Sequence, residues 1–307
     1  MAAVLLLAAC EKQRPPLEGG PAKPPETVLV APHEARALID HHNGRVAALH
    51  RFYADGVVTL RWRDDKGRHE EQADFELWID APHRAALRIH KLGEEFLFAG
   101  SSERGSWLLD LRRDDETAAY LARPGESLTV DASSPINLDP SALSDLLGLT
   151  PLPTDVRVAR VSESQTTQSL EAALARGDRL VVVRFNPKAM VPTSVELLVS
   201  TREVTFRSEP ELESYQSVEL DGVAPGAYPK LPRRVRVHDA RRRDDEVSLT
   251  IGFASGRAAD QNDRAFDIDL LLRRFEPKRV TGAMLPPPPF SGPTAPKSPA
   301  PKSPASN

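Results

Sequence analysis

The chain has 307 residues, of which 40% are hydrophobic, and its formal net charge of −4 comes from interspersed charges of both signs. This composition supports a sizeable core in one or two domains. It argues against a nucleic-acid partner, because no basic block is interleaved with aromatic residues. No run of 18 apolar residues occurs, so an ordinary membrane-spanning helix is not expected. A single cysteine excludes an internal disulfide and any multi-cysteine metal site.

The first ten residues, MAAVLLLAAC, have the pattern of a lipoprotein signal peptide. The apolar stretch Ala2–Ala9 is too short to span a bilayer and fits the apolar part of a signal peptide. Leu7-Ala8-Ala9-Cys10 resembles a bacterial lipobox, although no Lys or Arg precedes it. The resemblance implies that residues 1–9 are removed and that Cys10 is lipidated, with three acyl chains that anchor the protein firmly. Glu11, where an Asp would favour the inner membrane, favours the outer one. The alternative is an ordinary buried segment with an incidental cysteine.

A proline- and glycine-rich stretch, residues 10–30, is predicted to be a tether between membrane and domain, because it lacks enough apolar side chains to pack. Pro32 then opens a predicted helix at a favoured first-turn position. Asn43-Gly44 is expected to end that helix. The apolar face is expected to consist of Ala35, Leu38, Ile39 and His42.

Three histidines on this helix, His33, His41 and His42, raise the possibility of a metal site. Adjacent residues on a helix point about 100° apart, so His41 and His42 cannot grip one ion without a distant third ligand. We therefore expect one half-buried histidine, one solvated histidine and no metal or other cofactor.

Residues 55–112 alternate between apolar and polar side chains, which predicts strands with one apolar and one wet face. Polar turns that contain glycine separate the runs, as in an antiparallel meander. The apolar side of such a meander must be covered. Residues 128–130 are expected to continue the pattern.

Asp139 and Pro140 predict the start of a very short helix, and Gly148 predicts its end. A helix of about two turns is not stable by itself. Its three leucines, Leu143, Leu146 and Leu147, are therefore expected to cover the apolar face of the sheet.

The second half of the chain returns to strand patterns, with no βαβ rhythm. Residues 164–176 are expected to form a surface loop or a short helix, and residues 180–185 a strand in the middle of the sheet. Further strands are expected at residues 156–161, 195–199, 204–206, 218–220, 235–237, 247–253 and 266–272.

We count about ten to eleven strands, and a sheet of that size tends to curl. The predicted fold is mainly β with a few helices: a curved antiparallel sheet or unclosed β-barrel with a helical lid, spanning residues 31–284. Residues 285–307, rich in Pro, Lys and Ser, are expected to be a disordered tail.

The order of these parts resembles the bacterial lipoprotein carrier and receptor family (LolA/LolB-like). The similarity lies in residues 42–49 (HNGRVAAL), residues 75–87 with their LWIDAPHRAAL core, and Ser106-Trp107-Leu108-Leu109, and it extends over residues 34–278. It implies an unclosed barrel whose helices cap an apolar cavity for acyl chains. The soluble carriers of that family lack a lipobox. Its receptors have one, together with a protruding apolar loop that is not matched in this sequence.

The leading hypothesis is therefore a non-enzymatic, monomeric, membrane-tethered protein on the periplasmic face that binds lipid or the acyl chains of a lipoprotein. Burial of methylene groups would supply the affinity. The alternative fate of the same residues is a dry, closed core. The predicted cavity residues are Leu60, Phe75, Leu77, Ile79, Leu87, Ile89, Phe96 and Phe98 on the strands, with Leu143, Leu146 and Leu147 in the lid.

The two alternatives to lipid binding are an envelope scaffold and a hydrolase. An envelope scaffold without a small ligand would use the tail and charged loops such as residues 241–245 as interaction surfaces. A hydrolase is disfavoured, because the sequence contains no nucleophile-elbow, zinc-protease or phosphate-loop motif.

Overall fold

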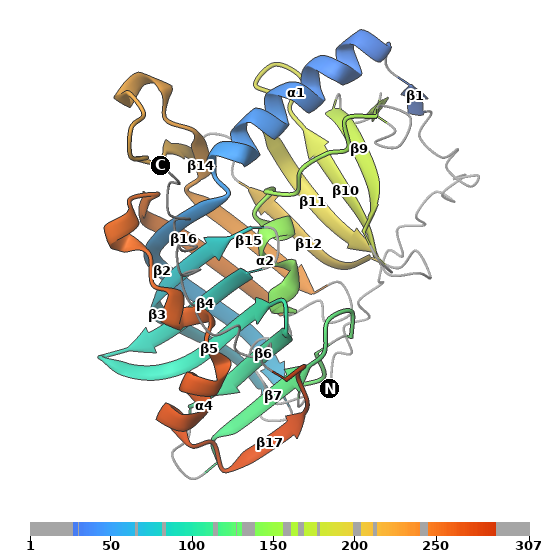
Figure 1. Cartoon of the computed structure of the whole chain (residues 1–307). Coiled ribbons are helices and arrows are strands. Elements are labelled where there is room, and N and C mark those ends of the chain that lie inside the picture. Colours follow the sequence, from blue (N-terminus) through green and yellow to red (C-terminus); the bar gives the residue numbers. More distant parts are fainter. Residues whose placement is uncertain are drawn as a thin grey trace, which may run out of the picture.

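One long, curved sheet organises the molecule (Figure 1). The computed structural model describes residues 27–29, 31–64, 67–81, 84–112, 116–126, 128–130, 139–155, 161–164, 169–176, 179–198, 204–210, 214–239 and 245–286. In sheet order, the fifteen strands formed by this part of the chain are β1 Thr27–Leu29, β8 Val161–Ser164, β9 Ser169–Arg176, β10 Arg179–Phe185, β11 Pro192–Leu198, β12 Val204–Pro210, β15 Arg234–Asp239, β16 Glu246–Ser255, β2 Arg51–Asp64, β3 Gly67–Asp80, β4 Arg84–Lys91, β5 Glu94–Ser102, β6 Gly105–Asp110, β7 Ala118–Ala122 and β17 Arg279–Gly282.

The sheet is unclosed, because β1 and β17 lie at its opposite ends and do not pair with each other. Its named strands pair antiparallel, except that β17 runs parallel to β7. A separate two-stranded sheet consists of β13 Tyr215–Ser217 and β14 Lys230–Pro232. The mainly β, unclosed architecture predicted from the sequence is confirmed. The predicted count of ten to eleven strands is too low, because short strands such as β1, β8, β7 and β17 carry too little periodicity to detect.

The predicted meander is confirmed as the consecutive strands β2 to β6. β2 and β3 have 14 residues each and pair along their full length, from Arg51 opposite Asp80 to Asp64 opposite Gly67. β2 also pairs with β16, so this long hairpin joins the N-terminal meander to the strands that come late in the chain.

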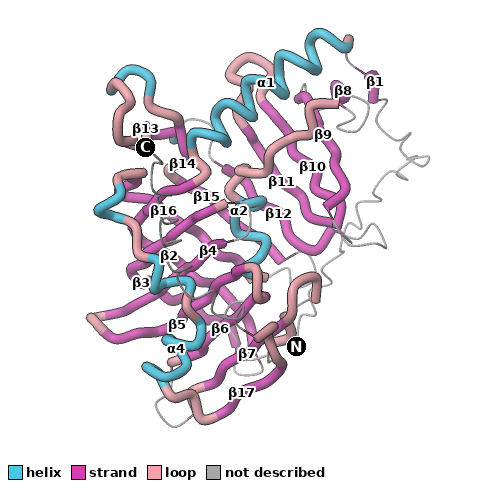
Figure 2. Tube along the Cα trace, viewed as in Figure 1, coloured by secondary structure: helices cyan, strands magenta, loops and turns pink. Residues whose placement is uncertain are grey.

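In the part of the chain that the structure describes, three helices and several 3-10 turns accompany the sheet. They are α1 Pro32–Ala48, α2 Leu143–Leu146 and α4 Ile268–Phe275, with η1 Pro140–Ala142, η3 Pro225–Ala227, η4 Ala258–Asp260 and η5 Asp263–Phe266. Figure 2 shows α2 inside the curve of the sheet, α1 along the half that contains β9 to β12, and α4 beside the half that contains β4 to β7. Among the described residues, no helix has both the length and the apolar character needed to cross a bilayer.

Helix α1 is longer than the sequence predicted. The apolar face of Ala35, Leu38, Ile39 and His42 is buried as expected. The helix does not end at Asn43-Gly44, because buried residues continue at helical spacing through Val46 to Leu49. The Asn43 side chain bonds to another segment instead of ending its own helix.

The strand predicted at residues 266–272 is wrong, because these residues form η5 and the start of α4. Asp267 caps α4 by accepting a hydrogen bond from the backbone N–H of Leu270. Ile268 and Leu271 are buried three residues apart, which is helical spacing. The apolar residues of 266–272 alternate as in a strand only because the run is rich in apolar residues.

Other local predictions also need correction. Residues 169–176 form strand β9, paired on both sides, although alanine-rich sequence is unusual in strands. Residues 128–130 are not in a strand, and residues 218–220 lie beyond the end of β13. Thr27–Leu29, assigned to the tether, pairs with β8 as an edge strand. Leu285, assigned to the tail, bonds through its backbone N–H and C=O to Arg104.

Candidate functional site: the concave face and its lid

The concave face of the sheet is lined by a continuous apolar cluster. The predicted wall residues Leu60, Phe75, Leu77, Ile79, Leu87 and Ile89 all belong to this cluster and are at most 1% exposed. The lid leucines Leu143, Leu146 and Leu147 belong to the same cluster. The structure therefore brings the predicted wall and lid together, and in this state their side chains fill the space between them.

The prediction of two inward-facing phenylalanines in β5 is only half right. Phe96 is partly buried against the concave cluster, whereas Phe98 packs with Trp78 and Trp107 in a second cluster on the other face. A register shift after Ile89 breaks the strand alternation, so Phe96 and Phe98 point to different faces although they are two residues apart. Leu97, which pairs with Ile89, is the residue of this trio that lies fully buried in the wall.

The lid consists of residues 139–152, which contain η1 and α2. Its start is as predicted: the Asp139 carboxylate accepts a hydrogen bond from the Ser141 N–H, and Pro140 follows the cap. Its helix ends at Gly148, whose φ of +68° favours glycine. A Cβ added at Gly148 would lie 3.0 Å from Cγ of Pro192, so the lid end sits close against the start of β11.

Polar contacts fix the lid to α1 and to β12. The Asn43 side chain donates to the carbonyl of Leu152 (2.7 Å) and accepts from the N–H of Leu152 (2.8 Å). The Ser208 hydroxyl donates to the carbonyl of Leu146. Within the lid, the Thr150 hydroxyl donates to the buried carboxylate of Asp145. Buried polar groups are thus concentrated where the lid meets the rest of the fold.

His42 and Arg45 make two further contacts from α1 to the lid. His42 is fully buried, and its Nε2 lies 2.7 Å from the carbonyl of Thr150, so Nε2 carries the proton and donates. Arg45 donates from Nη2 to the carbonyl of Gly148. The predicted half-buried histidine is therefore completely buried, whereas its neighbour His41 is exposed as expected.

The titration of His42 should make the free energy of unfolding depend on pH in the acid range. Burial, followed by the positive charge of Arg45, lowers the pKa of His42 from 6.5 to about 3. At pH values between these two pKa values, the unfolded chain binds more protons than the folded chain. The free energy of unfolding is therefore highest above about pH 6.5 and falls by up to about 1.4 kcal/mol per pH unit as pH decreases toward 3.

Urea denaturation between pH 7.5 and pH 4 tests this prediction. His42→Gln keeps a donor for Thr150 and should flatten the pH dependence, whereas His41→Gln should leave it unchanged. An unaltered slope in His42→Gln would show that the titration of this residue does not control acid stability.

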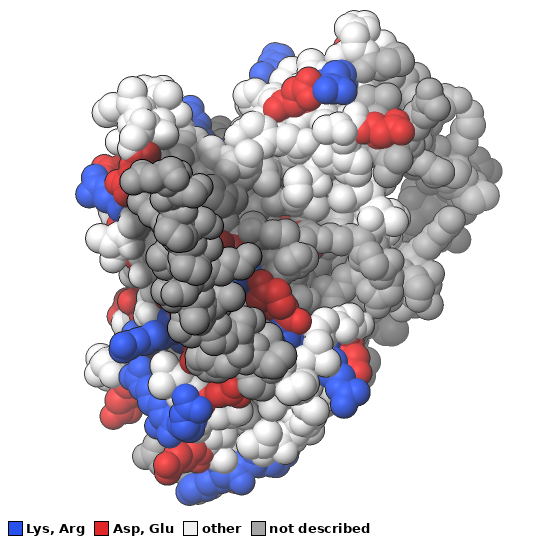
Figure 3. All heavy atoms as spheres, viewed as in Figure 1, with Lys and Arg blue, Asp and Glu red and all other residues white. Residues whose placement is uncertain are grey.

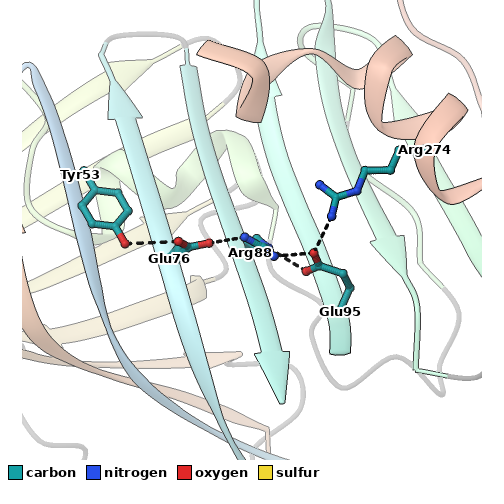
Figure 4. Close-up of polar contacts among 5 residues, drawn as sticks. All are labelled: Tyr53, Glu76, Arg88, Glu95 and Arg274. Carbon is teal, nitrogen blue, oxygen red and sulfur yellow. Dashed lines mark hydrogen bonds and ion pairs between the residues drawn. The ribbon is translucent and has the colours of Figure 1, made fainter. Parts of the chain in front are cut away.

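The opposite face of the sheet is charged and covered in part by α4. Figure 4 shows a row of side chains across β2 to β5 that ends on this helix. Tyr53 donates to Glu76, and Arg88 bonds both to Glu76 (2.6 Å) and, through two nitrogens, to Glu95, which also receives Arg274 (3.2 Å). Hydrogen bonding to Glu95 raises the pKa of Arg88. This paired network links the sheet to α4, whose Ile268 and Leu271 also pack in the apolar cluster of Trp78, Phe98 and Trp107 on the same face.

A cleft of about 650 Å³ lies at the rim of the sheet beside the end of α4. Its walls mix charged and aromatic side chains, and the lid leucines do not line it. The lining residues are Lys91, Leu92, Glu94, Glu95, Phe96, Leu111, Arg112, Thr117 and Phe275. Within the described ranges, no group of three or more His, Cys, Asp or Glu is placed to hold a metal ion.

One exposed apolar residue, in the turn between β4 and β5, was not predicted from the sequence. Leu92 is 95% exposed and has a positive φ of 54°. The Lys91-Leu92-Gly93-Glu94 turn could have indicated it, because a leucine occupies a turn position that is usually polar.

Figure 3 shows charged residues of both signs over the end of the molecule that carries α4 and β17, and fewer over α1.

Several predictions lie outside the described residues. They concern Cys10, the tether up to residue 26, most of the loop at 241–245 and the tail from residue 287. The predicted roles of these segments remain predictions.

Comparison with known proteins gives similarity to solved structures only. A LolA superfamily protein from Nitrosomonas europaea is 13% identical with a TM-score of 0.41, and the match covers 76% of this chain and 96% of that one. A putative outer membrane lipoprotein-sorting protein domain from Vibrio parahaemolyticus is 9% identical with a TM-score of 0.47, covering 78% and 99%. A DUF1329 family protein from Desulfovibrio piger is 10% identical with a TM-score of 0.44, covering 78% and 98%. No protein-family model and no curated protein matches the chain. At these values the matches concern the course of the chain and not a ligand.

Proposed function

We propose that this protein is a non-enzymatic, periplasm-facing lipoprotein that binds the acyl chains of lipid or of a lipoprotein beneath the lid. The observation that carries the proposal is the concentration of buried polar groups, among them His42, Arg45 and Asp145, around a lid that otherwise covers a purely apolar wall. Buried polar groups cost stability unless they are paired. A core needed only for stability would gain more from apolar side chains at these positions.

The lid is suited to leave the wall without unfolding the sheet. Its helix α2 has four residues, which do not form a stable helix alone, and it belongs to no strand. Its contacts to the rest of the fold are a few hydrogen bonds and a short row of buried apolar side chains, namely Ala142, Leu143, Leu146, Leu147, Leu149 and Leu152. Displacement of the lid would expose the wall for a hydrocarbon chain.

The energetic balance favours long chains. Release of the helical part of the lid alone, which carries Leu143, Leu146 and Leu147, costs roughly 5–9 kcal/mol, at about 1.5–3 kcal/mol for each leucine. An acyl chain gains about 0.8 kcal/mol per buried methylene, so the balance changes sign at roughly 6 to 11 methylenes. Chains of about 16 carbons can therefore replace the lid leucines, whereas chains of about six carbons cannot.

A fluorescence titration tests this proposal with the full chain carrying Cys10→Ser, which prevents lipidation. A neutral fluorescent probe with a 16-carbon chain should bind saturably at micromolar protein, and a 6-carbon analogue should not. If no chain length gives saturable binding, the acyl-binding proposal is wrong, and the envelope scaffold is the remaining explanation.

The anchoring part of the proposal rests on the sequence around Cys10. The Leu7-Ala8-Ala9-Cys10 pattern supports lipid attachment, and Glu11 supports the outer membrane. Metabolic labelling with a palmitate analogue should label the wild-type protein, and Cys10→Ser should abolish the label.

A further inference from the structure

Arg45 is a buried cation for which the described residues supply no ion-pair partner. Arg45 is only 8% exposed. Its guanidinium donates to the carbonyls of Lys230 (3.4 Å) and Gly148 and lies 3.5 Å from Nδ1 of His42, and all three acceptors are uncharged. Nε of Arg45 is buried and has no hydrogen-bond partner in the part of the chain that the structure describes.

The described neighbours of Arg45 do not supply a negative charge. Tyr215 is close enough to interact electrostatically, but its hydroxyl donates to the carbonyl of Pro192, and burial raises the pKa of this phenol, so it stays neutral. Nδ1 of His42 is the acceptor nitrogen of a neutral ring. Burial lowers the pKa of Arg45, which means that its charge is poorly compensated.

Other partly buried arginines of this protein are compensated. Arg88 pairs with Glu76 and Glu95, and Arg184 pairs with Glu171 and Glu196. An uncompensated buried charge is expensive, because the desolvation of the ion is not recovered by an opposite charge. Arg45 thus resembles half of an ion pair whose other half is not among the residues that the structure describes.

We propose that Arg45 binds the anionic headgroup, a carboxylate or a phosphate, of the lipid whose acyl chain lies beneath the lid. The inference rests on the proposed function and names the ligand class for the same site. The edge of the guanidinium formed by Nε and Nη2 suits two oxygens of one anion. Within the described ranges, Nε on this edge has no hydrogen-bond partner and the acceptors of Nη2 are uncharged.

The position of Arg45 couples headgroup binding to lid release. Nη2 holds the carbonyl of Gly148, which ends α2, and an anionic oxygen is a stronger acceptor than a carbonyl. An anion that takes this nitrogen would therefore free the end of the lid next to Leu147. The headgroup and the acyl chain would then act on the same segment.

The inference separates classes of ligand. A free fatty acid or a phospholipid brings an anion, whereas the acyl chains of a lipidated cysteine are joined through ester and amide groups without charge. We therefore expect this protein to prefer anionic lipid over the acylated end of a lipoprotein.

Competition experiments with the full chain carrying Cys10→Ser test the inference at pH 8. Hexadecanoate is compared with hexadecanol, and dimyristoyl phosphatidate with dimyristoyl glycerol, as competitors of the neutral 16-carbon probe. At least one anionic lipid should compete roughly tenfold more strongly than its neutral partner, as expected for hydrogen bonds to a charged group. The pair that shows the preference identifies carboxylate or phosphate as the headgroup.

Two variants assign the effect to Arg45. Arg45→Gln should reduce the preference to within about twofold, because a neutral amide cannot pair with the anion. Arg273→Gln removes the same charge from an exposed position on α4 and should keep the preference. If Arg45→Gln does not fold, Arg45→Lys keeps the charge, loses the two-nitrogen edge and should lose most of the preference.

Equal competition by anionic and neutral lipids in the Cys10→Ser chain would overturn the inference, as would a preference that survives in the Arg45 variant. In both cases, saturable binding of the neutral probe would still support the proposed function. Absence of any probe binding would instead contradict the proposed function itself.

Discussion

Leu146→Ala is expected to lower the free energy of unfolding by about 2–5 kcal/mol and, at the same time, to tighten acyl-chain binding. Leu146 is 1% exposed and contributes to the cluster shared by lid and wall. Its truncation removes lid contacts from the ligand-free state and leaves an apolar space that a hydrocarbon can fill. The ligand then competes against a weaker lid. Urea denaturation and the neutral-probe titration measure the two effects.

Leu109→Ala is the matched control. Leu109 is fully buried in the cluster on the other face, so its truncation should cost similar stability. It should leave the affinity for the probe unchanged, because Leu109 does not contribute to the concave cluster. Equal gains in affinity for both variants would mean that any core cavity takes the probe, and the special role of the lid would be refuted.

Phe75→Ala should lower the free energy of unfolding by about 3–5 kcal/mol. Phe75 is 1% exposed at the centre of the wall, opposite Gly56 on β2 and Ile89 on β4. In a closely packed wall, loss of the ring removes its buried area and leaves a cavity that neighbours fill only in part. The midpoint of chemical denaturation, at unchanged slope, measures this loss.

Phe253→Ala makes the same chemical change on the same sheet at a residue that is 41% exposed. Its cost should stay below about 1 kcal/mol. A cost for Phe75→Ala as small as that for Phe253→Ala would show that the wall is loosely packed and already has room for a ligand while the lid is closed.

The sequence was sufficient for features that depend on local pattern. Period-two alternation from residue 55 predicted β2 to β6, and the cap at Asp139 with Pro140 predicted the start of the lid. These predictions succeeded because strand faces and helix caps are decided by neighbouring residues. The apolar wall followed directly from the alternation, except in the run Phe96-Leu97-Phe98, where three apolar residues in a row leave the direction undecided.

Local pattern failed where a distant segment supplies the partner. Asn43 looks like a helix end, but it bonds to Leu152, more than a hundred residues away, and α1 continues past it. Residues 268–275 contain apolar residues at both strand and helix spacings, and packing against the outer face of the sheet selects the helix.

By itself, the sequence determined that the chain forms a curved antiparallel sheet with an apolar concave face and a short leucine-rich lid, because apolar residues at fixed periods must bury a common face. Only the tertiary structure decided that His42 and Arg45 meet the lid at Thr150 and Gly148. Burial and pairing depend on which distant segments fold together, and no sequence period encodes which groups lie beside a buried arginine.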